Sequence, residues 1–92
     1  MYHKPNISSI GEAEKLLEIN AVVSENARRL REEKRLTLEE AARLTGVSRS
    51  MLAQIEKGDV NPTISMVWKI ANGYRVSFTS LVEPVRQRPV LL

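Results

Sequence analysis

The sequence predicts an all-α fold of five helices, and three observations support this prediction. Apolar residues recur at helical spacing, as at Val23, Ala27 and Leu30. Ser or Thr residues stand where helices would begin, and glycines stand where two of them would end. No strand-like pattern continues beyond a few residues. A chain of 92 residues suffices for one domain with a modest core.

The composition excludes several classes of protein. The formal net charge of +3 is mildly basic, which fits a nucleic-acid partner without requiring one. The chain has no cysteine, so neither disulfides nor thiolate chemistry is available. No apolar run approaches the ~18 residues that span a bilayer, and no signal-peptide pattern opens the chain. We therefore expect a cytoplasmic protein with no membrane partner, no cofactor and no metal site.

The first predicted helix runs from about Ala21 to Lys34, with Val23, Ala27 and Leu30 on its apolar face. Residues 1–20 form an N-terminal extension in this interpretation. Its part from Ser9 to Asn20 is compatible with a further helix, which would pack either on the domain or on a partner.

Two short helices follow. Thr37 and Glu40 have the spacing of a capping box, so the second helix begins there and ends at Gly46. Ser48 is a suitable N-cap for the third helix, which ends at Gly58 by the same logic. Leu52 and Ile55 would be its inward residues.

The last two helices begin at hydroxyl residues as well. Thr63 precedes a strongly apolar fourth helix that continues to Asn72, in which we expect Trp68 to be core. Ser77 precedes a fifth helix with Phe78, Leu81 and Val82 inside. The domain then covers residues 21–83. Residues 84–92 contain two prolines and form a tail or linker.

The second and third helices have the arrangement of a helix-turn-helix. Ala42 is small where the helices would cross, Gly46 allows the turn, and Leu52 and Ile55 bury the third helix against the second. A helix of about two turns is not stable alone. Packing therefore fixes its inner face and leaves its outer face free for recognition.

The outer face of this third helix suits the reading of bases. Arg49 can reach O6 and N7 of guanine together, and Gln54 can pair with N6 and N7 of adenine. Ser48 and Ser50 can serve either a base or a phosphate. On composition alone, an ordinary solvated helix face explains these residues equally well.

From Val23 to Val82 the chain resembles the lambda-repressor-like, Cro/C1-type (XRE) DNA-binding domain. The combination "TLEEAA…GVSRSMLAQIEKG…NPT" is most similar to regulators that join this domain to a C-terminal cupin sensor. The resemblance implies a five-helix lambda-repressor-like fold in which the third helix, Ser48–Lys57, is the recognition helix. It implies base contacts at Arg49, Ser50 and Gln54. The phosphate contacts we expect are Thr37, Ser48, Lys57, Asn61 and Thr63.

The resemblance also implies structural roles. The residues matching Arg31 and Glu56 pair across the first and third helices in relatives, so we expect a largely buried salt bridge here. Three positions depart from the family pattern. Leu38 cannot contact phosphate as the usual Gln does, Thr45 replaces an apolar residue, and Arg75 replaces the Gly that closes the fourth helix. Arg75 would have to accept a positive φ or a different turn.

These observations predict a sequence-specific DNA-binding transcriptional regulator, of the repressor kind, that binds duplex DNA as a homodimer. We expect the fifth helix and the tail to contribute to that dimer. The alternative is a protein-interaction module of the same fold, such as an antitoxin or a transcription-bridging factor. An enzyme is not indicated, because Glu39 and Glu40 are helix-start residues rather than a catalytic pair. A sensor domain or a protein partner beyond the ends of this chain is compatible with the pattern.

Overall fold

A computed structural model describes the backbone of residues 7–85 and the side chains of residues 18–85. Five helices follow one another: α1 (Ile7–Glu33), α2 (Leu38–Thr45), α3 (Arg49–Lys57), α4 (Ile64–Tyr74) and α5 (Phe78–Val82). The described residues contain no strand, so the predicted all-α class is confirmed. Within the described residues, no helix combines the length and the hydropathy that a membrane span requires.

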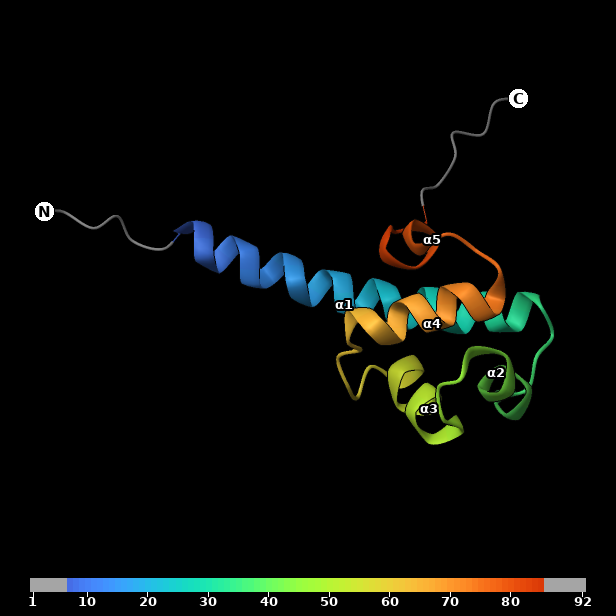
Figure 1. The fold of residues 1–92 in the computed structure, drawn as a ribbon. Coiled ribbons are helices and arrows are strands. Elements are labelled where there is room, and N and C mark those ends of the chain that lie inside the picture. Colours follow the sequence, from blue (N-terminus) through green and yellow to red (C-terminus); the bar gives the residue numbers. More distant parts are fainter. Residues whose placement is uncertain (1–6, 86–92) are drawn as a thin grey trace, which may run out of the picture.

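Four short helices gather around the C-terminal half of α1 (Figure 1). α1 packs against α3, α4 and α5, and α4 also packs against α2. The core takes residues from all five helices and from the α2–α3 turn. Its members are Val23, Ala27, Leu30, Ala41, Val47, Leu52, Ile55, Val67, Ile70, Ala71, Tyr74 and Leu81. The inward positions predicted at Leu52 and Ile55 are therefore confirmed.

Two predictions about helices are wrong. α1 begins at Ile7 rather than near Ala21, so the segment before Asn20 belongs to the same uninterrupted helix. Trp68 is not core: it is 50% exposed and lies against Phe78, with ring centroids 4.7 Å apart. Helical spacing identified the apolar face of α4 that carries Trp68, but the contact with Phe78 leaves half of the Trp68 side chain exposed.

Thr45 in α2 replaces an apolar residue of the family pattern, and its buried hydroxyl has hydrogen-bond partners both as donor and as acceptor. The Thr45 hydroxyl donates to the Ala41 carbonyl at 2.8 Å and accepts from the Val47 amide at 3.1 Å. α4 passes very close to this point, since a Cβ on Gly73 would lie 2.7 Å from the Leu44 oxygen and from the Thr45 Cα. Gly73 therefore allows the close crossing of α2 and α4.

A buried amide ties α1 to the end of the domain. Asn26 is 1% exposed, and its Nδ2 donates to the carbonyls of Leu81 and Glu83, both at 2.8 Å. These carbonyls at the end of α5 have no partner within so short a helix, so the Asn26 side chain supplies it. Nothing in the local sequence indicates this role beyond the position of Asn26 beside Ala27.

Candidate nucleic-acid interface

The start of α2 is held by a complete capping box. Thr37 Oγ1 accepts from the Glu40 amide at 3.1 Å, and the Thr37 amide donates to Glu40 Oε1 at 2.8 Å. The hydrogen bond from the Thr37 amide lowers the pKa of the Glu40 carboxyl. Gly46 ends the helix in the left-handed conformation, with φ 77°. The predicted bounds of α2 are therefore confirmed.

α3 is built in the same way. Ser48 Oγ accepts from the Met51 amide at 3.1 Å, and Gly58 ends the helix with φ 79°. Leu52 and Ile55 are fully buried, which fixes one face of α3 against the domain. A helix of nine residues depends on this packing for its stability.

The opposite face of α3 is open to solvent. Arg49, Ser50, Gln54 and Lys57 are all exposed, and the small Ala53 lies half-buried among them. The structure thus brings the three predicted base-contacting residues onto one surface, with the first two in the first turn of α3. This turn is the part of a recognition helix that contacts base edges in helix-turn-helix complexes.

The predicted phosphate contacts lie at the ends of the helices. Thr37 is exposed at the start of α2, while Asn61 and Thr63 are exposed in the loop between α3 and α4. The hydroxyls of Ser48 and Thr63 are already used as caps. Free amides at the starts of α2, α3 and α4 remain available to an anion such as a phosphate.

An ion pair fixes the orientation of α3. Arg31 Nε donates to Glu56 Oε2 at 2.8 Å, and Arg31 Nη2 donates to Glu56 Oε1 at 2.9 Å. Arg31 Nη1 donates to the Leu36 carbonyl at 2.8 Å, so the same side chain also holds the α1–α2 connection. The hydrogen bond to Glu56 raises the pKa of Arg31. The two side chains are 17% and 7% exposed, so the predicted salt bridge is confirmed.

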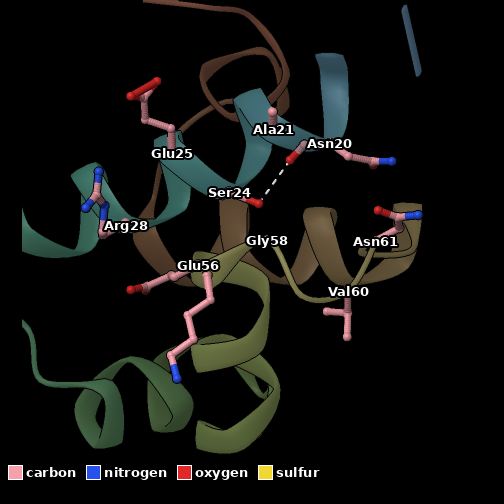
Figure 2. A pocket seen from close by; sticks show the side chains of 10 residues that line it. Asn20, Ala21, Ser24, Glu25, Arg28, Glu56, Gly58, Val60 and Asn61 are labelled. Atoms are coloured by element: carbon pink, nitrogen blue, oxygen red, sulfur yellow. Dashed lines mark hydrogen bonds between the residues drawn. The ribbon is translucent and has the colours of Figure 1, made fainter. Parts of the chain in front are cut away.

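A cavity of about 540 Å³ lies beside α3, between α1 and the loop that follows α3 (Figure 2). Asn20, Ser24 and Arg28 line it from α1, and Lys57 and Asn61 line it from the other side. Sequence reasoning missed this cavity. The only signal was the set of polar residues on α1 at helical spacing, which is also typical of an exposed face.

Comparisons with known proteins agree with this geometry. The family model HTH_3, described as helix-turn-helix, matches residues 28–81. The regulator SutR of Escherichia coli is 39% identical over 62 residues, which are 67% of this chain and 35% of SutR. The uncharacterised regulator y4dJ of Sinorhizobium fredii is 36% identical over 73 residues, which are 79% of this chain and 95% of y4dJ.

A solved structure has the same fold. The crystal structure of an HTH_3 family transcriptional regulator from Vibrio cholerae superimposes with a TM-score of 0.69 and 39% identity, over 72% of this chain and 37% of the other. The chain therefore spans about a third of SutR and of the Vibrio cholerae protein, and nearly all of y4dJ.

Proposed function

The chain belongs to the HTH_3 helix-turn-helix family, and on this premise we propose that it is a transcriptional regulator that reads a specific DNA sequence through α3. The observation that carries the proposal is the division of α3 into two faces. Leu52 and Ile55 are fully buried, and Arg49 and Gln54 are exposed. A helix held only by its inner face can enter the major groove with its outer face.

Each outer residue has a role in this proposal. Arg49 binds O6 and N7 of a guanine, Gln54 binds an adenine, and Ser50 contacts a base beside them. Thr37, Ser48, Lys57, Asn61 and Thr63 contact phosphates on either side of the groove and set the register of the domain. The Arg31–Glu56 pair, Gly46 and Gly58 hold α3 in place without contacting DNA.

We further propose a repressor that binds a near-palindromic site as a homodimer. A pair of domains would place two copies of α3 about 34 Å apart, one turn of DNA. Repression requires only that the bound protein occupy the site. The site of action is the cytoplasm, because the relatives come from bacteria, whose DNA lies there.

The resemblance to cupin-bearing regulators supports a sensor domain joined to this one, and the proposed regulator includes such a domain. The intact mass of the protein isolated from its native cells tests this point. A mass greater than the 10.4 kDa of this chain is the expected result.

A second function is favoured by the apolar surface of α4. Ile64 is 70% exposed and Trp68 is 50% exposed, one turn apart on the same helix. Such a surface fits a protein partner better than DNA. A protein-interaction module of this fold would therefore use α4 and would show no preferred DNA sequence.

Selection of bound duplexes from a random pool distinguishes the two functions. The regulator is expected to enrich a two-fold symmetric sequence, and scrambled DNA should bind at least a thousandfold more weakly, as is typical of specific complexes. Enrichment of no sequence, together with uniform weak binding that disappears at high salt, would contradict the proposal.

A further inference from the structure

The outward face of α3 is centred on one stripe of residues. Leu52 and Ile55 are both 0% exposed and mark the direction in which α3 faces the core. Successive residues of an α-helix are turned by about 100°, so the direction opposite to the core follows from the order of residues in α3. The stripe consists of the residues within roughly 50° of that direction, which are Ser50, Ala53, Gln54 and Lys57.

Ala53 stands in the middle of this stripe and has its shortest side chain. It is half-buried, whereas Ser50, Gln54 and Lys57 are exposed. It follows Ser50 by roughly 4.5 Å along the helix, so it lies between the first turn, which contacts base edges in helix-turn-helix complexes, and Lys57. A short side chain at this place lets the backbone of α3 come close to the bases opposite it.

Ala53 can neither donate nor accept a hydrogen bond through its side chain. In the major groove every base pair presents donors and acceptors, and the C5-methyl group of thymine is the one methyl group among them. A donor or acceptor opposite Ala53 would lose its water without gaining a partner, which is unfavourable. A thymine methyl group in the same place would instead bury apolar surface on both sides. The position of Ala53 therefore favours thymine.

From these observations we propose that Ala53 is a further specificity-determining residue of α3, whose methyl group contacts the C5-methyl group of one thymine in each half-site. The proposal rests on the proposed function and adds to it a base that is read without a hydrogen bond. It differs from the role of a spacer, in which Ala53 is small only to let its neighbours reach their bases. A spacer would be indifferent to the methyl group of any thymine.

Uracil substitution isolates the methyl group, because uracil differs from thymine only in lacking it. The duplex selected from the random pool is remade with the thymines of one half-site replaced by uracil, one at a time. For the parent chain, uracil at one of these positions should raise Kd about fourfold, the effect of losing one buried methyl group. Indifference to uracil at every position, or a selected half-site without thymine, would overturn the proposal.

The variant Ala53→Gly shows whether Ala53 is the group that contacts this methyl group. The measured quantity is the ratio of Kd for the uracil duplex to Kd for the thymine duplex. This ratio should fall from about four in the parent to about one in Ala53→Gly. Glycine also weakens a helix, but a uniform loss of folded protein or of affinity cancels in the ratio. A ratio that stays as high in Ala53→Gly as in the parent would assign the contact to another residue and overturn the proposal.

Ser50→Ala is the matched control, since Ser50 precedes Ala53 by about one turn on the same stripe. It should change the affinity through its own base and leave the uracil-to-thymine ratio of Kd at this thymine as in the parent. A ratio that falls to about one in Ser50→Ala as well as in Ala53→Gly would mean that the thymine responds to any change in α3, and the proposal would be wrong.

A duplex with 5-methylcytosine provides a test that needs no variant. Cytosine in place of this thymine removes the methyl group and also exchanges the O4 acceptor for the N4 donor. 5-Methylcytosine restores the methyl group alone. The parent should bind the 5-methylcytosine duplex about fourfold more tightly than the cytosine duplex. Equal Kd values for these two duplexes would contradict a contact with the methyl group.

Failure of this proposal and failure of the proposed function have different signatures. If a sequence is enriched but no uracil position depends on Ala53, the regulator stands and Ala53 is only a spacer. If no sequence is enriched, α3 reads no bases, and both the proposed function and the role of Ala53 are wrong.

Discussion

α3 and α4 are built alike and present opposite surfaces. Each begins at a hydroxyl cap, Ser48 or Thr63, that accepts from an amide three residues later at 3.1 Å. Each ends at a residue in the left-handed conformation, Gly58 in α3 and Arg75 in α4. The outer face of α3 is polar, whereas that of α4 carries the exposed Ile64 and Trp68.

This difference shows that the residues that stabilise each helix are distinct from the outward residues that are available for binding. Caps and inward residues fix the length and place of both helices, and they are of the same kind in each. The outward residues are not needed for that purpose. In α3 they can donate to and accept from base edges. In α4 the exposed Ile64 and Trp68 offer apolar area, which suits another protein surface. α3 has one further restraint, the Arg31–Glu56 ion pair.

The largest expected effect comes from breaking that pair. Glu56→Gln should lower the free energy of unfolding by about 3–5 kcal/mol, because Arg31 would remain largely buried without its counter-charge. α3 should loosen while α4, which no ion pair holds within the described residues, keeps its contacts with α2. Urea denaturation followed by circular dichroism measures the change.

The exposed ion pair of α1 provides the control. Arg29 Nη1 and Glu33 Oε2 are 3.0 Å apart, but the side chains are 35% and 59% exposed. Glu33→Gln should therefore cost no more than about 1 kcal/mol. Equal losses in Glu33→Gln and Glu56→Gln would mean that burial gives the Arg31–Glu56 pair no special role.

The same contrast shows what the sequence could predict. The ends of α2 and α3 and the start of α4 were predictable because hydroxyl caps and Gly46 and Gly58 act within a few residues of themselves. The end of α4 was predicted less well, since the helix continues beyond Asn72 to Tyr74. The positive φ of Arg75, 57° in the structure, is one of the two alternatives that the family resemblance left open at this position. Trp68 was predicted wrongly because periodicity finds the apolar side of a helix without showing whether another element covers it.

Other features depend on contacts between distant residues. Nothing local marks Asn26 as the partner of carbonyls 55 and 57 residues away. Nothing in the spacing marks the cavity beside α3, whose walls come from residues near 24 and near 60. The Arg31–Glu56 pair was foreseen from a family resemblance rather than from residue spacing. The assignment of DNA contacts remains a prediction, although the exposure of Arg49, Ser50 and Gln54 is consistent with it.

DNA binding provides the next largest effect and sharpens the contrast between the helices. Arg49→Ala should cost about 1–3 kcal/mol on the preferred site and relax the choice of one base pair, because its bidentate contact to guanine is lost. Lys57→Ala should weaken all sequences about equally and reduce the slope of log K against log salt by about one. Titrations of preferred and scrambled duplexes at several salt concentrations measure both.

Ser65→Ala is the matched control, since Ser65 is exposed on α4. It should leave both affinities unchanged. If Arg49→Ala weakens preferred and scrambled DNA alike, Arg49 is a phosphate contact and specificity depends on Ser50 and Gln54.

α3 and α4 differ in the residue that ends them in the left-handed conformation, which is Gly58 in α3 and Arg75 in α4. Gly58→Ala should destabilise the domain by about 1–2 kcal/mol, the usual penalty of a left-handed residue with a Cβ. A Cβ there makes only ordinary contact, with Ser24 Oγ at 3.8 Å, so the backbone alone is tested. Arg75→Gly should act in the opposite direction by up to about 1.6 kcal/mol, because relief of about 1–2 kcal/mol of left-handed strain is offset by about 0.4–1 kcal/mol for the greater freedom of glycine in the unfolded chain.

Gly46→Ala gives the reference value, because its Cβ would meet no atom within 4 Å and its φ of 77° is nearly that of Gly58. Thermal unfolding of the three variants compares them. A loss in Gly58→Ala well beyond that in Gly46→Ala would show that Ser24 and the cavity wall resist even a methyl group.

The smallest effect at neutral pH is expected at Tyr74, which ends α4 inside the core. Its side chain is 1% exposed, and its hydroxyl has no hydrogen-bond partner within the described part of the chain. Tyr74→Phe removes this unpaired group and keeps the ring, so it should leave the free energy of unfolding unchanged or raise it by up to about 1 kcal/mol.

At high pH the difference in stability between Tyr74→Phe and the parent grows. Burial raises the pKa of Tyr74 to about 12 from the ordinary 10.0. The folded state therefore holds its phenol proton more tightly than the unfolded state, and this part of the stability is complete below pH 10.0 and lost as the pH rises towards 12. Urea titrations of both proteins at pH 7 and pH 11 isolate the effect, because all other groups that titrate there are shared. The parent should lose more stability than Tyr74→Phe between the two pH values, and equal losses would mean that the buried end of α4 admits water to the Tyr74 hydroxyl.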